Sequence, residues 1–344
     1  MRSFHHPGNA LHDPRFFLSR GQVLANYEIP ARAEALLAGL ATLGMVPDVA
    51  VLATAAQLQT VHAQDYIDFL AKVGPAWVAL AGTGPEAVAN SFPHPDALAS
   101  GGRCPAGLTG QLGWYTADTA CPIGSHTWQA SLGAAGCALA AAAEAAAGRQ
   151  AYALCRPPGH HAYAARAGGH CYLNNAALAV QALRAAGAKR VAVLDIDSHH
   201  GNGTQGIFWQ RADVLTVSVH GDPNGYYPWF TGHAEETGGP GAEARNLNLP
   251  LALGTADNGW LAAVARGVAA VQGFGAEALV VSLGFDASEH EPLNALAVTP
   301  DGFAQAGSMI GALRLPSAIV QEGGYNLTLL GPLLHRFLTG WGNA

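Results

Sequence analysis

The residues best suited to chemistry lie in one short segment, residues 195–203, which contains two aspartates and two adjacent histidines. An apolar run at 191–194 precedes this segment and glycines end it, so the run is predicted to be a buried strand that stops where the polar residues begin. Asp197 and His199 are two positions apart, which places both side chains on the same side of an extended backbone. Because buried charges are costly unless they are paired or bind a metal, this pair is a candidate set of metal ligands.

Five apolar runs in the second half of the chain are predicted to be strands, and each one ends at polar residues. The strands are predicted at 152–155, 190–194, 214–219, 278–283 and 317–320. The polar segments that follow them are 156–161, 195–203, 220–222, 284–286 and 321–325. Parallel strands place their C-terminal ends on one edge of a sheet, where open α/β sheets bind ligands, so we expect these segments to converge on one crevice.

Asp197, His199 and Asp286 would bring two carboxylates and one imidazole to this edge. Three protein ligands leave one coordination position open for water, as a catalytic zinc site requires. Zinc(II) is therefore the expected metal, although the oxygen-rich set also suits Fe(II), Mn(II) or Co(II). A metal held there would polarise a carbonyl group and lower the pKa of a water molecule.

The adjacent imidazoles of His160 and His161 are candidates for proton transfer beside such a metal. One imidazole would take a proton from the water, and the other would protonate the leaving amine. Asp195 and Asn202 are the candidate partners that orient and tune the two rings. Tyr325 follows two glycines, which let the backbone approach a pocket closely, so its hydroxyl is a candidate to stabilise an oxyanion opposite the metal.

The elements that must position these residues alternate between strand and helix from residue 150 onward. Helices are predicted at 31–43, 127–148, 175–186, 259–271 and 301–313. Apolar strands that alternate with helices predict a parallel sheet covered on both faces. No linker or charge block divides the chain, so we expect a single α/β domain over 1–344, with residues 76–113 as a long loop rich in Gly, Pro, Ala and Ser.

The composition argues against several classes of protein. The chain has 17 Lys and Arg against 24 Asp and Glu, and its basic residues are scattered, so nucleic-acid binding is not expected. The N-terminus has no apolar signal core, and Ala-rich segments such as 130–147 are interrupted by Glu144, so these segments are predicted to be buried helices rather than membrane spans. Five cysteines without a CxxC pair favour a reducing compartment, and we expect the cytoplasm.

Several motifs occur in an order that resembles the motif series of the arginase/deacetylase superfamily. They are the segments 156–161 (RPPGHH), 168–175 (GGHCYLNN), 195–204 (DIDSHHGNGT), 282–286 (SLGFD) and 322–325 (EGGY). Other segments are more similar to bacterial acetylpolyamine amidohydrolases and histone-deacetylase-like amidohydrolases than to nuclear histone deacetylases, namely 92–93, 220–224, 226–228, 234–238 and the insertion at 76–113. The resemblance spans nearly the whole chain and implies the arginase/deacetylase fold, an eight-stranded parallel sheet sandwiched between helices.

The resemblance also implies a zinc-dependent deacetylase that hydrolyses an acylated amine, such as an acetylpolyamine or an acetyl-lysine-like substrate, to a carboxylate and an amine. The implied catalytic residues are His160, His161 and Tyr325, with Asp195 and Asn202 as the partners of the two histidines and His161 as the proton donor to the amine. The implied zinc ligands are Asp197, His199 and Asp286. A structural potassium ion would bind the backbone carbonyls of Asp195, Asp197 and His199 together with Ser218. Gly169, His170 and Tyr227 would line the substrate tunnel, and the insertion would build a homodimer.

Three positions depart from the family pattern. His170 stands where an aromatic Phe or Tyr is usual, which makes the tunnel wall more polar and predicts a side chain that is partly cationic at low pH. Ala120 stands where the family has an acid that binds the substrate amide or amine, and Asp118 is the candidate substitute. Glu291 replaces a commoner aspartate. The missing acid weakens the polyamine assignment and favours a small amide, or an acylated amine of unusual shape.

Three other interpretations compete with this one. An arginase-like di-metal hydrolase would need carboxylates at positions 201 and 288, which are Gly201 and Ser288. A dinucleotide-binding oxidoreductase is suggested by the GxGxxG pattern at 201–206, since Asp222 lies about where a ribose-binding acid would fall. However, the carboxylates of that loop would repel a pyrophosphate. A non-catalytic binder on a deacetylase scaffold is the third interpretation, and the complete set of catalytic and metal positions argues against it.

Overall fold

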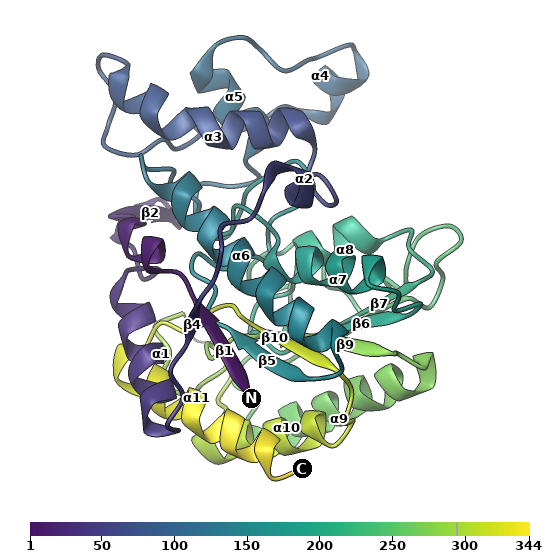
Figure 1. The fold of residues 1–344 in the computed structure, drawn as a ribbon. Helices are drawn as coiled ribbons and strands as arrows, with labels where there is room; N and C mark the ends of the chain where they lie inside the picture. The colour runs from purple at the N-terminus through teal and green to yellow at the C-terminus, as the bar shows by residue number, and fades with distance from the viewer. Residues whose placement is uncertain (294) are drawn as a thin grey trace.

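The computed structural model describes residues 1–293 and 295–344, and its centre is one eight-stranded sheet (Figure 1). The strands lie in the order β4-β1-β5-β10-β9-β6-β7-β8, and every neighbouring pair is parallel. Their bounds are β1 (Arg2–His5), β4 (Asp48–Val49), β5 (Gln150–Ala153), β6 (Val191–Asp195), β7 (Val214–Gly221), β8 (Asn246–Leu251), β9 (Ala278–Leu283) and β10 (Ser317–Gln321). The predicted α/β class and the eight-stranded parallel sheet are confirmed.

Helices cover both faces of the sheet. Successive residues of a strand point to opposite faces, and both sets are apolar in the central strands, so each face must be buried. The covering helices are α1 (Ala31–Thr42), α6 (Thr127–Ala146), α7 (Asn175–Ala185), α8 (Asn202–Phe208), α9 (Asp257–Phe274), α10 (Pro300–Gly311) and α11 (Leu327–Gly342). Val191 and Val193 of β6 belong to the core cluster formed with α6, α7 and α8. Ala192 and Leu194 belong to the opposite cluster, formed with α1, α9, α10 and α11. Burial on both faces explains why the central strands are continuous apolar runs in the sequence.

A further group of helices packs beyond α6, at the end of the molecule drawn uppermost in Figure 1. They are α2 (Ala55–Leu58), α3 (Gln64–Ala79), α4 (Pro95–Ala99) and α5 (Leu108–Tyr115). Residues 76–113, predicted to be a long loop, therefore contain the end of α3, all of α4 and most of α5. Tertiary packing stabilises these helices, since Phe69 of α3 stacks on Tyr115 of α5 with a ring-centroid distance of 4.7 Å.

The sequence patterns also missed elements at the margins of the sheet. The edge strand β8 carries Asn246 and Asn248, and these buried amides break the apolar run. The helix α11 contains Pro332, which obscured its helical pattern. A two-stranded antiparallel hairpin, β2 (Phe16–Ser19) with β3 (Gln22–Ala25), and a 3₁₀ turn, η1 (Pro7–Leu11), complete the described elements. Within the described residues, no helix combines the length and apolar character that a membrane span needs.

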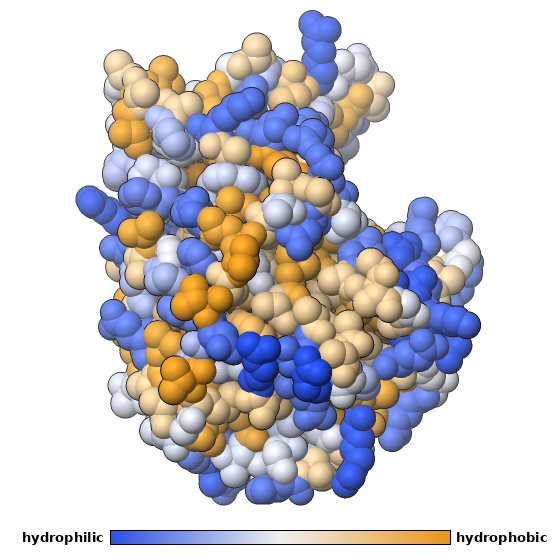
Figure 2. Space-filling view, viewed as in Figure 1, coloured by the Kyte–Doolittle hydropathy of each residue, from blue (hydrophilic) through white to orange (hydrophobic). Residues whose placement is uncertain are grey.

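The opposite edge of the sheet is the two-residue strand β4, and short, charged edge strands resist pairing with other chains. Arg2 donates hydrogen bonds to Asp48 at 2.6 Å and to Glu144 at 2.7 Å, which places charges along this edge. Figure 2 shows apolar groups beside charged ones on this side of the molecule, and the exposed side chains of Val46 and Val49 lie in the segment that includes β4.

The buried His62 makes stability dependent on pH. Its Nδ1 donates to the carbonyl of Ala164 at 3.2 Å and its Nε2 accepts from the backbone N–H of Asn174 at 3.0 Å, an arrangement that only the neutral ring satisfies. Burial lowers the pKa of His62 to about 4, whereas the unfolded chain takes up this proton near pH 6.5. Between those values the unfolded state binds more protons, so the contribution of His62 to stability is present above pH 6.5 and is lost as the pH falls toward 4.

We therefore expect the His62→Gln variant to be less sensitive to acid than the wild type. A glutamine can donate to Ala164 and accept from Asn174 without titrating. Urea unfolding at pH 7.5 and pH 5.0 should show that the wild type loses about 2 kcal/mol more than the variant on acidification, because one pH unit corresponds to about 1.4 kcal/mol. Equal losses in the two proteins would contradict this account of His62.

Candidate active site

The predicted convergence of polar segments is found at the C-terminal edge of the sheet. Asp195 is the last residue of β6 and pairs in register with Ser218 of β7 and Ser282 of β9. The segments after β5, β6, β9 and β10 are joined around this point by hydrogen bonds. The arrangement follows from parallel pairing, which gives adjacent strands the same direction.

Asp197, His199 and Asp286 form one buried cluster whose ligand atoms all lie within 4.8 Å of one another. His199 Nδ1 lies 3.2 Å from Asp197 Oδ1 and 3.0 Å from Asp286 Oδ2. Backbone N–H groups fix the carboxylates, because Ser198 donates to Asp286 Oδ1 and Gly323 donates to Asp197 Oδ2, both at 2.8 Å. Among the residues that the structure describes, this is the one group of three metal-ligating side chains so close together.

The electrostatics of this cluster fit a divalent cation. Burial and the neighbouring charge of Asp197 raise the pKa of Asp286. Burial opposes charge on His199, but hydrogen bonds to Asp197 and Asp286 overcome it and raise the pKa of His199 to about 9. Two buried carboxylates that share one imidazole are stabilised by a positive ion. The cradle is also tight, since a Cβ at Gly284 would lie 2.1 Å from Asp197 Oδ2 and one at Gly323 would lie 2.2 Å from Asp286 Oδ2.

His160 and His161 lie beside this cluster with a ring-centroid distance of 4.0 Å. His160 Nδ1 lies 2.9 Å from Asp195 Oδ2, and His161 Nδ1 lies 2.6 Å from Asn202 Oδ1. Burial disfavours charge on both rings. The carboxylates of Asp197 and Asp195 nevertheless raise the pKa of His160, whereas burial and the neighbouring rings of His160 and His199 lower that of His161. The structure thus pairs each histidine with its predicted partner and gives the two rings opposite preferences for a proton.

Glu322 is a buried residue of this site for which the sequence suggested no role. Its Oε2 accepts hydrogen bonds from the backbone N–H groups of Gly159 at 2.6 Å and His160 at 3.1 Å, so it holds the loop that carries the two histidines. Burial raises its pKa to about 7. The EGGY motif marked Glu322 as a residue of interest. Its contact with Gly159, 163 positions away in the sequence, cannot be inferred from the spacing of residues.

Tyr325 lies on the same edge, and two buried groups fix it. Glu291 Oε2 accepts a hydrogen bond from the backbone N–H of Tyr325 at 2.8 Å, and the guanidinium of Arg32 lies 4.7 Å from the centre of its ring. Arg32 also donates to the carbonyls of Gly324 and Glu322, both at 2.6 Å. Burial raises the pKa of the Tyr325 phenol, so the hydroxyl keeps its proton and can donate a hydrogen bond. The sequence suggested no role for Arg32 in the site. The feature that could have revealed one is a charged residue on the apolar face of the helix predicted at 31–43.

The predicted tunnel residues Gly169 and Tyr227 are joined by one carboxylate, that of Asp118. Asp118 Oδ2 accepts from the hydroxyl of Tyr227 at 2.6 Å and from the N–H of Gly169 at 3.0 Å, while Oδ1 accepts from the N–H of Ala120 at 2.7 Å. Asp118 therefore joins the segments that carry Ala120, Gly169 and Tyr227. Its role as the acid that binds the substrate amine stays a prediction, since three donors leave one of the about four acceptor positions of a carboxylate open.

We expect the Asp118→Asn variant to weaken substrate binding without regard to substrate charge. An amide nitrogen would face one of three donors, and a buried donor left without an acceptor costs about 1–3 kcal/mol of stability. The KM values should rise together for cationic and neutral acylated amines, measured in parallel with the free energy of unfolding. A rise of KM confined to cationic substrates would instead identify Asp118 as the acid that binds the substrate amine.

His170 is 6% exposed and lies between two aromatic rings. Its ring centroid is 5.6 Å from that of Phe17 and 6.1 Å from that of Tyr325. Burial, together with the charges of Arg32 and His199, lowers its pKa to about 3. The predicted cationic form of His170 is therefore confined to pH values near 3, since the closed surroundings disfavour the charged ring.

The glycines of the GxGxxG pattern serve close packing within the site. A Cβ at Gly201 would lie 2.4 Å from Asp195 Oδ2, and one at Gly203 would lie 2.3 Å from the carbonyl oxygen of Ala162. The space that a pyrophosphate would need beside these glycines is thus filled by the carboxylate of Asp195 and by the loop that follows His160 and His161. This packing contradicts the dinucleotide interpretation.

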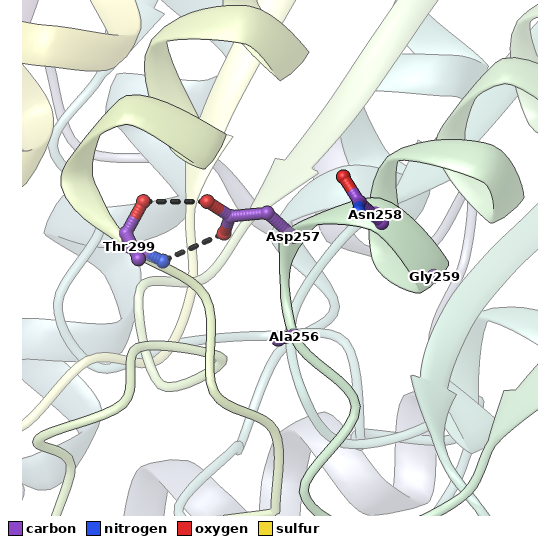
Figure 3. Close-up of a pocket in the computed structure, with 5 residues that line it drawn as sticks. All are labelled: Ala256, Asp257, Asn258, Gly259 and Thr299. Atoms are coloured by element: carbon purple, nitrogen blue, oxygen red, sulfur yellow. Dashed lines mark hydrogen bonds between the residues drawn. The ribbon is translucent and has the colours of Figure 1, made fainter.

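A separate cavity lies at the N-terminal ends of α9 and α10 (Figure 3). It is lined by Ala256, Asp257, Asn258, Gly259 and Thr299. The carboxylate of Asp257 accepts from the N–H of Thr299 at 2.8 Å and from its hydroxyl at 2.6 Å, so it ties the two helix ends together. None of the predicted site residues lines this cavity, and we assign it a structural role.

Comparison with known proteins gives one consistent result. The histone deacetylase domain model matches residues 26–340. The chain is 44% identical to an acetylpolyamine amidohydrolase of Burkholderia pseudomallei, with 99% of each protein covered. It is 39% identical to acetylpolyamine amidohydrolase 1 of Pseudomonas aeruginosa, with 100% of this chain and 99% of that protein covered. The crystal structure of an acetylpolyamine aminohydrolase from Burkholderia pseudomallei matches with a TM-score of 0.94 at 43% identity, covering 99% of this chain and 98% of that one.

Proposed function

The chain belongs to the histone deacetylase family as a metal-dependent hydrolase that deacylates amines, and from this premise we propose that its metal is zinc(II) and its substrate an N-acetylated polyamine. The observation that carries the proposal is the buried Asp197–His199–Asp286 cluster with two imidazoles beside it. His160 Nε2 lies 3.8 Å from Asp197 Oδ1, and the ring centroid of His161 lies 5.7 Å from that of His199. The polyamine assignment is supported by the names of the full-length relatives, which are acetylpolyamine amidohydrolases.

In this proposal the ligands of the metal are Asp197, His199 and Asp286. Two oxygens and one nitrogen suit zinc, and Fe(II), Mn(II) or Co(II) would be accepted by the same donors. When bound, a divalent metal supplies a Lewis acid for the amide carbonyl and acidifies a water molecule. We keep the predicted potassium site at the backbone carbonyls of Asp195, Asp197 and His199 with Ser218, whose hydroxyl lies 2.8 Å from His220 Nδ1.

His161 is the residue that we assign to proton transfer in both directions. Since Asn202 Oδ1 is an acceptor, Nδ1 of His161 bears a hydrogen and Nε2 is free to accept a proton from the attacking water. Burial lowers the pKa of His161, so the protonated ring is a strong acid that releases this proton to the leaving amine. The carboxylate of Asp195, 2.9 Å from His160 Nδ1, favours the protonated form of His160, so this ring is suited to stabilise negative charge, which differs from the division of roles expected from the sequence.

Tyr325 and Glu322 support this reaction from the loop after β10. The protonated phenol of Tyr325 donates a hydrogen bond to the oxygen that becomes negative as the amide carbonyl is attacked. Glu322 keeps the histidine loop in place through its two backbone hydrogen bonds. In this proposal Gly169, His170 and Tyr227 form the wall along which the methylene chain of the acylated amine would lie.

We further propose that the chain forms a homodimer through the segment 76–113 and resides in the cytoplasm. Leu80, Phe92 and Leu98 in that segment are exposed, and a second copy would remove them from water. All five cysteines are free thiols, and four of them are buried, which suits a reducing compartment.

The proposal is tested by hydrolysis of a substrate panel by the zinc-loaded protein. The panel contains acetyl-lysine peptides, N-acetylated polyamines and small neutral amides, each with and without a chelator. We expect chelator-sensitive turnover, with the highest kcat/KM for the acetylated polyamines. Preference for the neutral amides would favour the small-amide alternative, and absence of turnover with one bound metal per chain would favour a non-catalytic binder.

A further inference from the structure

A series of aromatic rings lies between the Asp197–His199–Asp286 cluster and the surface of the protein. Tyr226 stacks on His199 with a centroid distance of 4.5 Å and an interplanar angle of 18°. The ring of Tyr227 meets His161 edge-on at 4.9 Å. Trp229 is the next ring outward, 5.3 Å from Tyr227 at 81°, and it is 51% exposed. The indole is thus one ring removed from the catalytic histidines and open to solvent.

The backbone holds this exposed indole in a defined place. Trp229 has a φ of +61°, a left-handed conformation that is uncommon for a residue other than glycine. Its N–H donates to the carbonyl of Tyr226 at 3.1 Å, and the next N–H, that of Phe230, donates to Pro228 at 2.7 Å. Further along the loop, Glu236 accepts from the N–H of Gly232 at 3.0 Å. A left-handed backbone conformation held in place at a half-exposed tryptophan indicates a functional constraint at this position.

The nearby charges indicate which ligand chemistry fits. Asp118 accepts hydrogen bonds from Tyr227, Gly169 and Ala120, which occupy three of the about four acceptor positions of its carboxylate and leave little capacity for an ammonium group. The chain as a whole carries a net charge of −7, which attracts cations over long distances. The electron-rich face of an indole attracts an ammonium group, and tryptophan is the best aromatic residue for this contact.

Building on the proposed function, we propose that Trp229 is a specificity-determining residue that binds the ammonium group of the substrate by a cation–π contact. An acylated amine bound with its carbonyl at the metal cluster and its chain along Tyr227 would present an ammonium, several bonds from the scissile amide, to the indole. The preferred substrates are then acylated diamines and longer polyamines rather than acylated alkylamines of the same length.

The experiment compares two substrates that differ only in charge, mono-N-acetyl-1,4-diaminobutane and N-acetylpentylamine, with the zinc-loaded full chain. The measured quantity is the ratio of their kcat/KM values in the wild type, Trp229→Leu, Trp229→Phe and Phe230→Leu. Leucine keeps apolar bulk and the same backbone requirement but removes the π face, whereas phenylalanine keeps part of it. Phe230 is the matched control, since it is the adjacent aromatic residue and is 88% exposed.

We expect Trp229→Leu to lower this ratio about three- to tenfold through KM, as a partly exposed cation–π contact implies. Trp229→Phe should lie between the leucine variant and the wild type, and Phe230→Leu should keep the wild-type ratio. Circular dichroism and sedimentation accompany the kinetics.

Three outcomes would overturn the inference. The first is an unchanged ratio in folded Trp229→Leu, and the second is a lower kcat at constant KM. The third is an equal effect of Trp229→Leu and Phe230→Leu accompanied by dissociation of an oligomer, which would make Trp229 a contact with a second copy of the chain. Failure of the wild type to hydrolyse either amide would instead refute the proposed function itself.

Discussion

The Tyr325→Phe variant is expected to lower kcat by about 10²–10³-fold, the usual cost of removing one donor to a developing oxyanion. The substitution deletes a single hydroxyl. The ring would keep its place, because Arg32 lies over it at 4.7 Å and Glu291 accepts from its backbone N–H at 2.8 Å. Steady-state kinetics on the best substrate of the panel would measure the loss.

Metal content and folding are the controls for this variant. Zinc stoichiometry by mass spectrometry and the melting temperature should both match the wild type, because Tyr325 is not one of the three proposed metal ligands. If kcat stayed within about threefold of the wild type, the oxyanion would depend on other donors, and the role assigned to the tyrosine would be wrong. If activity and zinc fell together, the residue would act through the metal site.

The Asp286→Asn variant is expected to weaken zinc binding by more than about 100-fold and to abolish turnover. Mutation of residues that only hydrogen-bond to metal ligands already costs about 10–100-fold in affinity, and Asp286 is a proposed ligand itself. The physical reason is the loss of one of two anionic donors in a cluster with a single imidazole. Zinc titration against a competing chelator measures the affinity.

The same variant gives a second, independent signal without metal. Burial and Asp197 raise the pKa of Asp286, so the charged carboxylate is unfavourable in the empty site. Metal-free Asp286→Asn should therefore melt no lower than the metal-free wild type, and zinc should raise the melting temperature of the wild type but not that of Asp286→Asn. Ser288→Ala is the matched control, since Ser288 is buried in the same loop and its hydroxyl has no hydrogen-bond partner among the residues that the structure describes. Zinc-dependent stabilisation of Asp286→Asn equal to that of the wild type would remove Asp286 from the ligand set.

Local patterns in the sequence were sufficient to predict the central strands and the polar segments that follow them. The strand at 278–283 was predicted with the observed bounds, because a strand buried on both faces is a continuous apolar run. Parallel pairing then brings the ends of such strands together. For this reason, the meeting of Asp197, His199 and Asp286 could be predicted although 89 positions separate Asp197 from Asp286 (286 − 197).

Only the tertiary structure decided the charge states and the hydrogen-bond partners of the remaining site residues. Asp118 was predicted to bind substrate, and only its contacts with Gly169 and Tyr227 reveal that it joins parts of the site. Burial decides that His170 is neutral, and a contact between α1 and the loop after β10 makes Arg32 the support of Tyr325. The physical reason is common to all three: a pattern reports the intrinsic preference of a segment, whereas charge state and hydrogen bonding depend on groups that folding brings from distant parts of the chain.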